Sequence, residues 1–323
     1  MKGGKFDDSI LKKIIFDNIK YKREEVLLGS GTGIDSSIIN LGGDLVVVTT
    51  DPITAAVNNV GRLCINICCN DIAAAGGEPV AILVTLLMPY DYDISNIEKI
   101  IRELDSECKK LSVQLAGGHT EKTDAVTRLV LVATVIGKKK NFIQQKVVPG
   151  DMLIMTKSAG LEGSSIIASD YEDRFKNILH KNQIEFLKDL IDEISVIPES
   201  KIACLNNAKY MHDITEGGVL GAAWEISKLA KCNIEVYCDE IFIYDETKII
   251  CMNLNIDPLR LISSGSMLIA ADKNDADIII KELNKNKINA KIIGKFIKGE
   301  SVYIKQDISY ALTEPTEDEI YKI

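Results

Sequence analysis

The sequence lacks a long apolar run, an excess of basic residues and any C-x-x-C pair. Its longest apolar stretches, near residues 80–88 and 129–136, are too short to span a bilayer. With a net charge of −9, the chain also lacks the basic face that general nucleic-acid binding requires. We therefore expect neither a membrane protein nor a nucleic-acid-binding protein.

The eight cysteines have no spacing typical of a zinc site, and most of them lie in apolar runs. This pattern is typical of reduced thiols that pack as small hydrophobic side chains in a cytosolic protein. The first ten residues, MKGGKFDDSI, lack the apolar core of a signal peptide. Together these features predict a cytoplasmic protein.

Several common catalytic signatures are also absent. The sequence has no G-x-x-x-x-G-K-[ST] loop and no G-x-S-x-G elbow, which argues against a P-loop NTPase and a Ser-His-Asp hydrolase. The glycines of GSGTG at 29–33 lack the third glycine and the preceding strand of a dinucleotide-binding fingerprint.

The length of 323 residues is sufficient for two domains, since single domains usually have about 100–200 residues. The basic triplet at 138–140 and the turn VPGD at 148–151 mark the expected boundary. We predict an N-terminal domain at residues 1–148 and a C-terminal domain at residues 149–323.

Strand-like and helix-like patterns occur in both halves and predict an α/β (α+β) fold. In the N-terminal half we expect strands at 45–50, 80–88, 112–116 and 128–137, and helices at 59–77 and 95–110. The first strand should end at Asp51-Pro52, since a proline restricts the residue before it. Ser95 should cap the second helix, and the apolar strand at 80–88 should be covered on both faces.

Six acidic residues lie at the ends of these elements, in glycine-flanked loops or among apolar residues. They are Asp35, Asp51, Asp71, Glu121, Asp213 and Glu216. Asp71 lies within an otherwise apolar helix, where a carboxylate is costly to bury unless it is paired or bound to metal. Mg²⁺ prefers oxygen ligands and bridges carboxylates to phosphates, so the set favours a Mg–nucleotide site. Each acid taken alone is explained equally well as a cap or turn residue.

Two glycine loops precede helices, at residues 158–164 and at Gly217-Gly218. Main-chain N–H groups at such positions can hold phosphate oxygens, although a tight turn is the commoner use of each loop alone. His119 and His212 lie beside these acidic motifs. Lone histidines of this kind more often make structural hydrogen bonds than take part in catalysis.

Taken together, these segments resemble the aminoimidazole-ribonucleotide (AIR) synthase superfamily. The resemblance covers about residues 25–310 and is carried, in order, by GIDSSII, TTDP, NDIAAAGGEP, AGGHTE, HDITEGGVLGAAWEIS and IDPLRLISSG. The superfamily contains AIR synthase, thiamine-monophosphate kinase, selenophosphate synthetase and the HypE-type carbamoyl dehydratase of hydrogenase maturation. It implies an N-terminal mixed sheet that pairs into a β-barrel across a homodimer, and a C-terminal α/β sandwich.

The resemblance also implies ATP and Mg²⁺ as cofactors. The metal ligands it implies are Asp35, Asp51, Asp71, Asp213 and Glu216. The nucleotide-binding residues it implies are Thr50, Asn70, Gly117, Gly118, Thr215, Gly217 and Gly218. The catalytic residues it implies are Asp51, Asp71, His119 and Glu121, with the last two near the phosphoryl acceptor.

The resemblance is nearest to the HypE type. It implies phosphoryl transfer that activates a carbonyl or carboxamide oxygen of a small molecule or carrier. The HypE type ends in a cysteine that carries the carbamoyl group, whereas this sequence ends EPTEDEIYKI and its last cysteine is Cys251. Two alternatives therefore stay open: a small-molecule kinase like thiamine-monophosphate kinase, and a nucleotide-binding partner protein with reduced catalysis.

Overall fold

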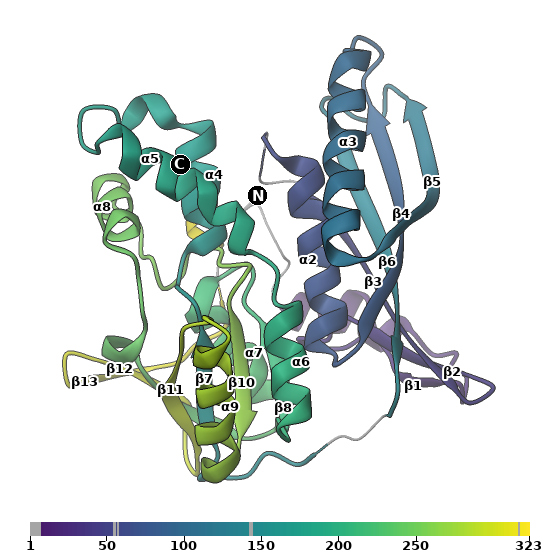
Figure 1. The fold of residues 1–323 in the computed structure, drawn as a ribbon. Helices are drawn as coiled ribbons and strands as arrows, with labels where there is room; N and C mark the ends of the chain where they lie inside the picture. The colour runs from purple at the N-terminus through teal and green to yellow at the C-terminus, as the bar shows by residue number, and fades with distance from the viewer. Residues whose placement is uncertain (1–7, 54–55, 57, 142–144, 316) are drawn as a thin grey trace. The chain divides into compact units, whose positions relative to one another are not determined.

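The structure is a computed structural model that describes residues 8–53, 56, 58–141, 145–315 and 317–323. It divides into two compact units, each containing a sheet and helices (Figure 1). Apart from the gaps just given, the N-terminal unit contains residues 24–29 and 35–142. The C-terminal unit contains residues 30–34, residues 143–323 and the chain before residue 24. The α/β class is confirmed in both units, and the domain boundary at residue 148 stays a prediction.

The N-terminal unit contains a six-stranded sheet with the order β1-β2-β3-β6-β4-β5. Its strands are β1 (Val26–Leu28), β2 (Ser37–Leu41), β3 (Asp44–Ile53), β4 (Glu78–Met88), β5 (Gln114–Lys122) and β6 (Val130–Lys139). All neighbours are antiparallel except β4 and β5, which are parallel. Within the described residues β1 and β5 form two open edges, so this sheet is not a closed barrel. Its pairing across a dimer stays a prediction.

Helices α2 (Val60–Ala74) and α3 (Ile94–Leu111) lie side by side on this sheet (Figure 1). Helix α2 packs on β3, β4 and β6 and is buried along most of its length, because its residues are small or apolar. Helix α3 is amphipathic and buries Ile100 and Leu104. Its N-cap is Asp93, which accepts a hydrogen bond from the main-chain N–H of Ser95, so the predicted cap at Ser95 is wrong by two residues.

Strand β3 does not end at Asp51-Pro52, as the sequence predicted, but continues to Ile53. Asp51 and Pro52 pair with Ala133 and Val132 of β6. Strand β2 lies on the other edge of β3 and pairs with it only as far as Val48. Pro52 lies beyond this pairing, so the main-chain N–H that proline lacks is not required for a hydrogen bond to β2. The residue before a proline prefers an extended backbone, and Asp51 has this conformation because it lies within β3.

Two further predictions for this unit need correction. The expected strand before the glycine pair instead runs through it, because Gly117 and Gly118 pair with Leu83 and Val84 inside β5. The second face of β4 is not covered in the single chain, where Val80 and Leu83 are 44% and 39% exposed. The apolar run in β4 therefore has one face on α2 and one face without a helix among the described residues.

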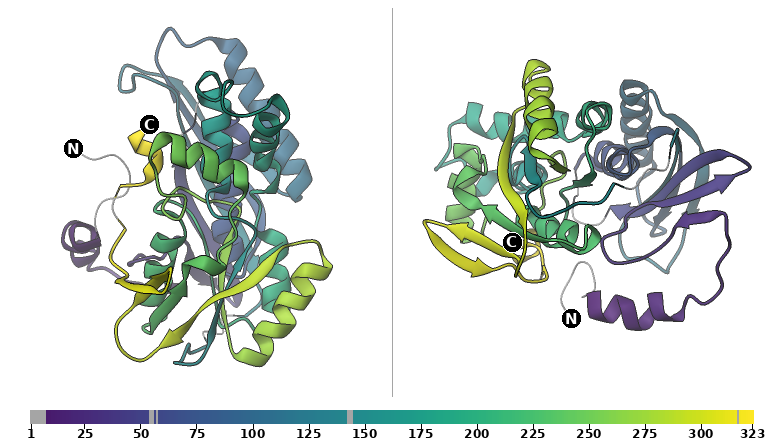
Figure 2. Two further views of the ribbon diagram at one scale, coloured as in Figure 1. Left: turned by 90° about the vertical axis from the view of Figure 1, so that its left-hand side faces the viewer. Right: turned by 90° about the horizontal axis from the view of Figure 1, so that it is seen from below.

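The C-terminal unit contains a seven-stranded sheet with the order β13-β12-β9-β11-β7-β10-β8, seen from two further directions in Figure 2. The strands are β7 (Met152–Thr156), β8 (Tyr210–Asp213), β9 (Asn233–Tyr237), β10 (Met267–Ala271), β11 (Ala290–Ile297), β12 (Val302–Lys305) and β13 (Ile308–Ala311). The helices are α1 (Asp8–Ile14), α4 (Leu161–Asp170), α5 (Lys181–Asp189), α6 (Ile197–Leu205), α7 (Gly218–Leu229), α8 (Asp245–Leu254) and α9 (Lys273–Lys285).

The core of this unit has helices on both faces of the sheet. Strand β10 is buried at all five residues, with α7 on one face and α9 on the other (Figure 1). Leu153, Leu268 and Phe296 of the sheet pack in one apolar cluster with Val219 and Ile226 of α7. This confirms the predicted α/β sandwich and makes α7 a rigid support for the loop before it.

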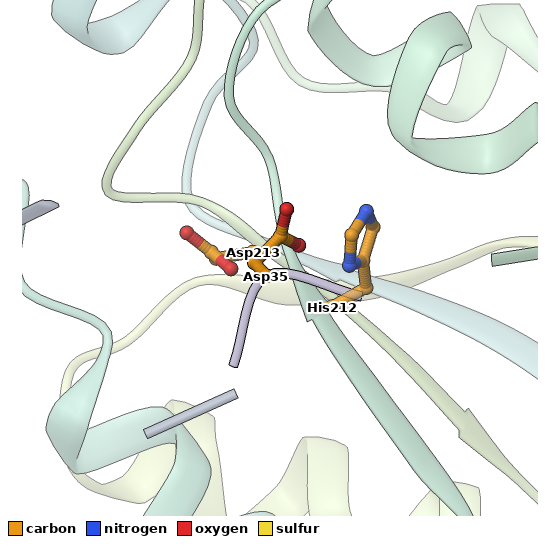
Figure 3. A group of neighbouring side chains, drawn as sticks. All are labelled: Asp35, His212 and Asp213. Carbon is orange, nitrogen blue, oxygen red and sulfur yellow. The ribbon is translucent and has the colours of Figure 1, made fainter. Parts of the chain in front are cut away.

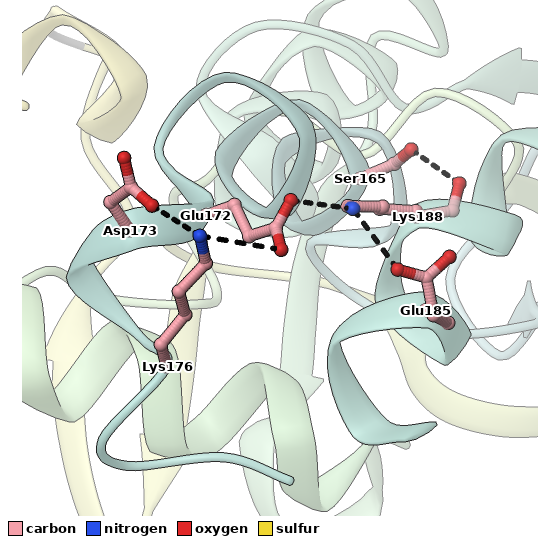
Figure 4. A network of polar contacts seen from close by, with 6 residues as sticks. All are labelled: Ser165, Glu172, Asp173, Lys176, Glu185 and Lys188. Carbon is pink, nitrogen blue, oxygen red and sulfur yellow. Dashed lines mark hydrogen bonds and ion pairs between the residues drawn. The ribbon is translucent and has the colours of Figure 1, made fainter. Parts of the chain in front are cut away.

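A charged network on the surface joins α5 to the 3-10 turn η2 (Glu172–Arg174). The Nζ of Lys188 lies 2.8 Å from Glu172 and 3.1 Å from Glu185 (Figure 4). The Lys188 ammonium lowers the pKa of the Glu172 carboxyl. Ser165 of α4 donates to the main-chain oxygen of Lys188. Because the charges face solvent, the network positions the turn more than it stabilises the fold.

None of the helices in the described part of the chain has the length and apolar character needed to cross a membrane.

Candidate functional site

Two of the predicted acids in the N-terminal unit meet at one threonine hydroxyl. The Oγ1 of Thr49 lies 2.7 Å from Oδ2 of Asp71 and 3.2 Å from Oδ2 of Asp51. The same atom lies 2.8 Å from the main-chain oxygen of Asp35. The structure therefore brings Asp35, Asp51 and Asp71, which are far apart in the sequence, to one position on β3.

Strand alternation and helix packing explain this meeting. Residues 49 and 51 lie on the same side of β3, because side chains alternate along a strand. Helix α2 packs on β3 and carries Asn70 and Asp71, which are 0% and 5% exposed. A buried carboxylate is costly unless it is hydrogen-bonded, and Thr49 supplies such a contact to Asp71.

Two cysteines of α2, Cys68 and Cys69, neighbour these acids. The hydrogen bond with Cys64 and burial raise the pKa of the Cys68 thiol well above its usual value. Burial does the same for Cys69. Without a metal ion both thiols therefore stay protonated at neutral pH, and the atoms that meet at Thr49 are carboxylate and hydroxyl oxygens. Mg²⁺ prefers such oxygens, so the residues present fit this cation.

Thr50 lies on the opposite face of β3 from Thr49. It is exposed, donates to the main-chain oxygen of Ala133 at 3.0 Å and accepts from Thr134 at the same distance. These two contacts of Thr50 are with β6, whereas Asp51 and Asp71 contact Thr49. The family resemblance implied Thr50 as a nucleotide-binding residue and gave Thr49 no role, although strand alternation from Asp51 pointed to residue 49.

Strand β5 carries the other predicted residues of the N-terminal unit. His119 and Glu121 lie two residues apart on the exposed edge strand, with Nε2 and Oε2 3.1 Å apart. Gly118 approaches β4 so closely that a Cβ there would lie 1.9 Å from the main-chain oxygen of Val84. Gly117 has more space, since its nearest neighbour is a Leu83 methyl group at 3.7 Å. Gly118 thus has a packing reason to be glycine, independent of any ligand.

In the C-terminal unit, His212 and Asp213 lie at the end of β8 (Figure 3). Both are buried, at 4% and 2% exposure. The Nε2 of His212 lies 3.0 Å from Oε2 of Glu225 on α7, so this histidine has a buried carboxylate partner. Asp35, also drawn in Figure 3, belongs to the N-terminal unit.

The four remaining predicted residues lie in the loop that joins β8 to α7 and at the first residue of α7, Gly218. The main-chain oxygen of Thr215 accepts from the N–H of Gly218 at 3.1 Å, which closes the turn. The carboxylate of Glu216 accepts a 2.9 Å hydrogen bond from the hydroxyl of Tyr321. The N–H of Gly217 donates to Asp318 at 2.6 Å. Asp318 and Tyr321, which no sequence pattern singled out, therefore contact this loop.

The other glycine loop, at 158–164, is used within the chain. The N–H of Gly160 donates to Ser263 at 2.6 Å, and that of Gly163 donates to the main-chain oxygen of Ile262 at 3.0 Å. Burial raises the pKa of Glu162 to about 7. A fully buried carboxyl in the first turn of α4 and internally bonded N–H groups favour a structural role for this loop.

Family comparisons agree with the order of these motifs. Residues 33–138 match the family model described as AIR synthase related protein, N-terminal domain. Residues 148–307 match the model described as AIR synthase related protein, C-terminal domain.

Among curated proteins, the chain is 28% identical over 302 residues to a putative hydrogenase expression/formation protein of Methanocaldococcus jannaschii, covering 90% of this chain and 88% of that protein. It is 20% identical to the carbamoyl dehydratase HypE of Rhizobium leguminosarum bv. viciae, covering 86% and 81%. It is 23% identical to the selenide, water dikinase of Clostridioides difficile, covering 88% of each.

Solved structures show the same fold at low identity. The chain has a TM-score of 0.74 and 18% identity to a chain of a HypE–HypF complex, covering 95% of this chain and all of that one. The TM-score is 0.72 at 17% identity to a ThiL complexed with AMPPCP and TMP, covering 93% and 92%. It is 0.69 at 16% identity to a HypE in complex with ATP, covering 99% and 98%.

Proposed function

Because the chain belongs to the AIR synthase related protein family, we propose that it catalyses ATP- and Mg²⁺-dependent phosphoryl transfer to a carbonyl or carboxamide oxygen. The acceptor would be a small molecule or a carrier-bound group. The observation that carries this proposal is the group formed by Thr49, Asp51 and Asp71, with distances of 2.7 and 3.2 Å to the threonine hydroxyl. Three similar proteins support it: a HypE solved in complex with ATP, a carbamoyl dehydratase and a selenide, water dikinase.

The proposed ligands of Mg²⁺ are the carboxylates of Asp35, Asp51, Asp71, Asp213 and Glu216. The proposed nucleotide contacts are Thr50, Asn70, Gly117, Gly118, Thr215, Gly217 and Gly218. When bound, Mg–ATP supplies the transferable phosphoryl group and positive charge beside it. The residues of the chain then contribute positioning and charge neutralisation, and no covalent protein intermediate is required.

His119 and Glu121 are the proposed residues beside the acceptor. With Nε2 of His119 donating to Glu121, Nδ1 is left to accept a proton from the acceptor group. Phosphorylation then converts an oxide, which is a poor leaving group, into phosphate, which is a good one. The oxygen leaves with the phosphate when the activated carbon is dehydrated or attacked by a nucleophile.

The test is ADP release with Mg²⁺ across a panel of carbamoyl, carboxamide and phosphate-ester metabolites. We expect Asp71→Asn to lower the rate at least about 100-fold, because a metal ligand loses its charge. The matched control is Asp105→Asn on the exposed side of α3, which should turn over like the parent chain. Full turnover by Asp71→Asn would contradict the proposal.

The products distinguish the alternatives. Inorganic phosphate together with a dehydrated or cyclised product supports activation of an oxygen. A phosphorylated metabolite supports a kinase, which the likeness to the ThiL fold favours as the second candidate. ATP binding without turnover on the whole panel would instead support a nucleotide-binding partner protein.

A further inference from the structure

Thr49, which the sequence analysis left without a role, has three oxygen neighbours in the N-terminal unit. They are Oδ2 of Asp71 at 2.7 Å, the main-chain oxygen of Asp35 at 2.8 Å and Oδ2 of Asp51 at 3.2 Å. The threonine is 3% exposed, so bulk water hardly competes for its hydroxyl. One buried side chain thus contacts three residues that come from separate segments.

A threonine hydroxyl carries one hydrogen, whereas a carbonyl oxygen and an ionised carboxylate only accept. The hydroxyl of Thr49 therefore donates to one of its three neighbours at a time. The shortest contact is the one to Asp71, and hydrogen bonds to carboxylates are the stronger kind. One carboxylate oxygen of Asp51 and one of Asp71 contact the same hydroxyl, so the two carboxylates lie close together.

We propose that Thr49 is a positioning residue for the magnesium-binding acids. Its hydroxyl donates to the carboxylate of Asp71 and so orients it beside that of Asp51. This inference rests on the proposed function, in which these three acids are metal ligands. Hydrogen-bond partners behind metal ligands fix the orientation of those ligands, and their loss typically costs 10- to 100-fold in metal affinity.

A packing role for Thr49 would give a different pattern of mutant behaviour. The side chain has a methyl group as well as a hydroxyl, and it lies on the buried side of β3. Thr49→Val keeps the branched shape and removes the hydroxyl, whereas Thr49→Ser keeps the hydroxyl and removes the methyl group. Positioning through the hydroxyl predicts that only valine weakens metal binding, and packing predicts that only serine does.

The test is a titration of the full chain with Mn²⁺, used in place of Mg²⁺ and followed by electron paramagnetic resonance without nucleotide. We expect Thr49→Val to weaken Mn²⁺ binding about 10- to 100-fold and Thr49→Ser to bind like the parent chain. Circular dichroism and thermal melting establish that each variant is folded. If the valine variant does not fold, Thr49→Cys replaces the hydroxyl by a weak donor and carries the same expectation.

The matched control is Thr247→Val in the C-terminal unit. Thr247 is also buried, and its Oγ1 lies 2.9 Å from Oγ of Ser164, which is not a proposed ligand. It should bind Mn²⁺ like the parent chain. Unchanged Mn²⁺ affinity in Thr49→Val, or equal loss in the serine variant, would overturn the inference.

Asp71→Asn, titrated in the same way, separates this inference from the proposed function. If Asp71→Asn weakens Mn²⁺ binding and Thr49→Val does not, only the role of Thr49 is wrong. If Asp71→Asn binds Mn²⁺ like the parent chain, the proposed metal site itself is wrong.

Discussion

The main-chain N–H of Gly217 donates a 2.6 Å hydrogen bond to the carboxylate of Asp318, which lies 101 residues further along the chain. The same carboxylate accepts from the N–H groups of Ile262 and Ile320 at 3.2 and 2.8 Å. Gly217 is the N-cap residue of α7, where main-chain donors and the helix dipole favour a negative charge. The chain thus places its own carboxylate against an N–H group that we assign to phosphate binding.

We predict that Asp318→Ala weakens folding but tightens ATP binding. Loss of a buried acceptor for three N–H groups should cost about 1–3 kcal/mol of unfolding free energy. The N–H of Gly217 is then free for a phosphate oxygen, and a repelling charge is gone. Urea denaturation measures the first effect, and the KM for ATP, expected to fall severalfold, measures the second.

Asp272→Ala is the matched control for Asp318→Ala. Asp272 caps α9 by accepting from the N–H groups of Asn274 and Asp275 at 2.9 and 3.1 Å. Its loss should lower stability by about 1 kcal/mol and leave the KM for ATP unchanged. An unchanged KM in Asp318→Ala as well would mean that Gly217 does not bind phosphate.

A second prediction concerns Glu162 and pH. Burial raises its pKa from the ordinary 4.5 to about 7, so the folded protein keeps a proton that the unfolded chain releases. This contribution to stability is complete below pH 4.5 and is lost as the pH rises through 7. Its size is on the order of 3 kcal/mol, since each pKa unit corresponds to about 1.4 kcal/mol. Glu162→Gln should remove this part of the pH dependence.

The measurement for Glu162 is the urea midpoint at pH 5 and pH 8 for the parent chain and the variant. We expect the difference between the two pH values to shrink in Glu162→Gln. Glu98→Gln on the exposed face of α3 is the control and should keep the parent difference. Equal pH dependence in the parent chain and Glu162→Gln would show that the Glu162 carboxyl titrates near its ordinary pKa.

A third prediction concerns Gly218 and distinguishes two costs of replacing it by alanine: backbone strain and a clash of the added Cβ with its neighbours. Gly218 and Gly42 both have left-handed backbones, with φ of +62° and +72°. A Cβ at Gly218 would lie 2.7 Å from the main-chain oxygen of Leu259, whereas one at Gly42 would meet nothing within 4 Å. Gly42→Ala should therefore cost about 1–2 kcal/mol, and Gly218→Ala about 2 kcal/mol more. Similar thermal melting of both variants would contradict the close approach seen at Gly218.

A fourth prediction concerns assembly through the uncovered face of the N-terminal sheet. Leu83 and Ile136 are 39% and 36% exposed on β4 and β6, on the face opposite α2. We expect a homodimer that buries this face, and burial of one such side chain contributes about 1 kcal/mol per subunit. Leu83→Glu should convert the dimer to monomer in light scattering, whereas Leu205→Glu on α6, where the leucine is 75% exposed, should not. A monomeric parent chain would contradict the expectation.

The fold was predictable from local patterns because strands and helices bury their apolar residues at different periods. The amphipathic helix α3 and strand β6 lie within one or two residues of their predicted bounds. The end of β3 was not predictable, because the fit of Pro52 depends on where β2 stops pairing. The path of β5 through Gly117-Gly118 likewise depends on its neighbour β4.

The sequence by itself determined which residue types could hold a cation and phosphate, because motif order and buried acids are visible along the chain. It also determined the α/β class of both units through hydrophobic periodicity. Only the tertiary structure decided that Thr49 rather than Thr50 contacts Asp71, and that Asp318 accepts a hydrogen bond from Gly217. These contacts join residues that are 22 and 101 positions apart in the sequence. They depend on the face of a strand to which a side chain points and on the packing of the whole unit, which no local pattern encodes.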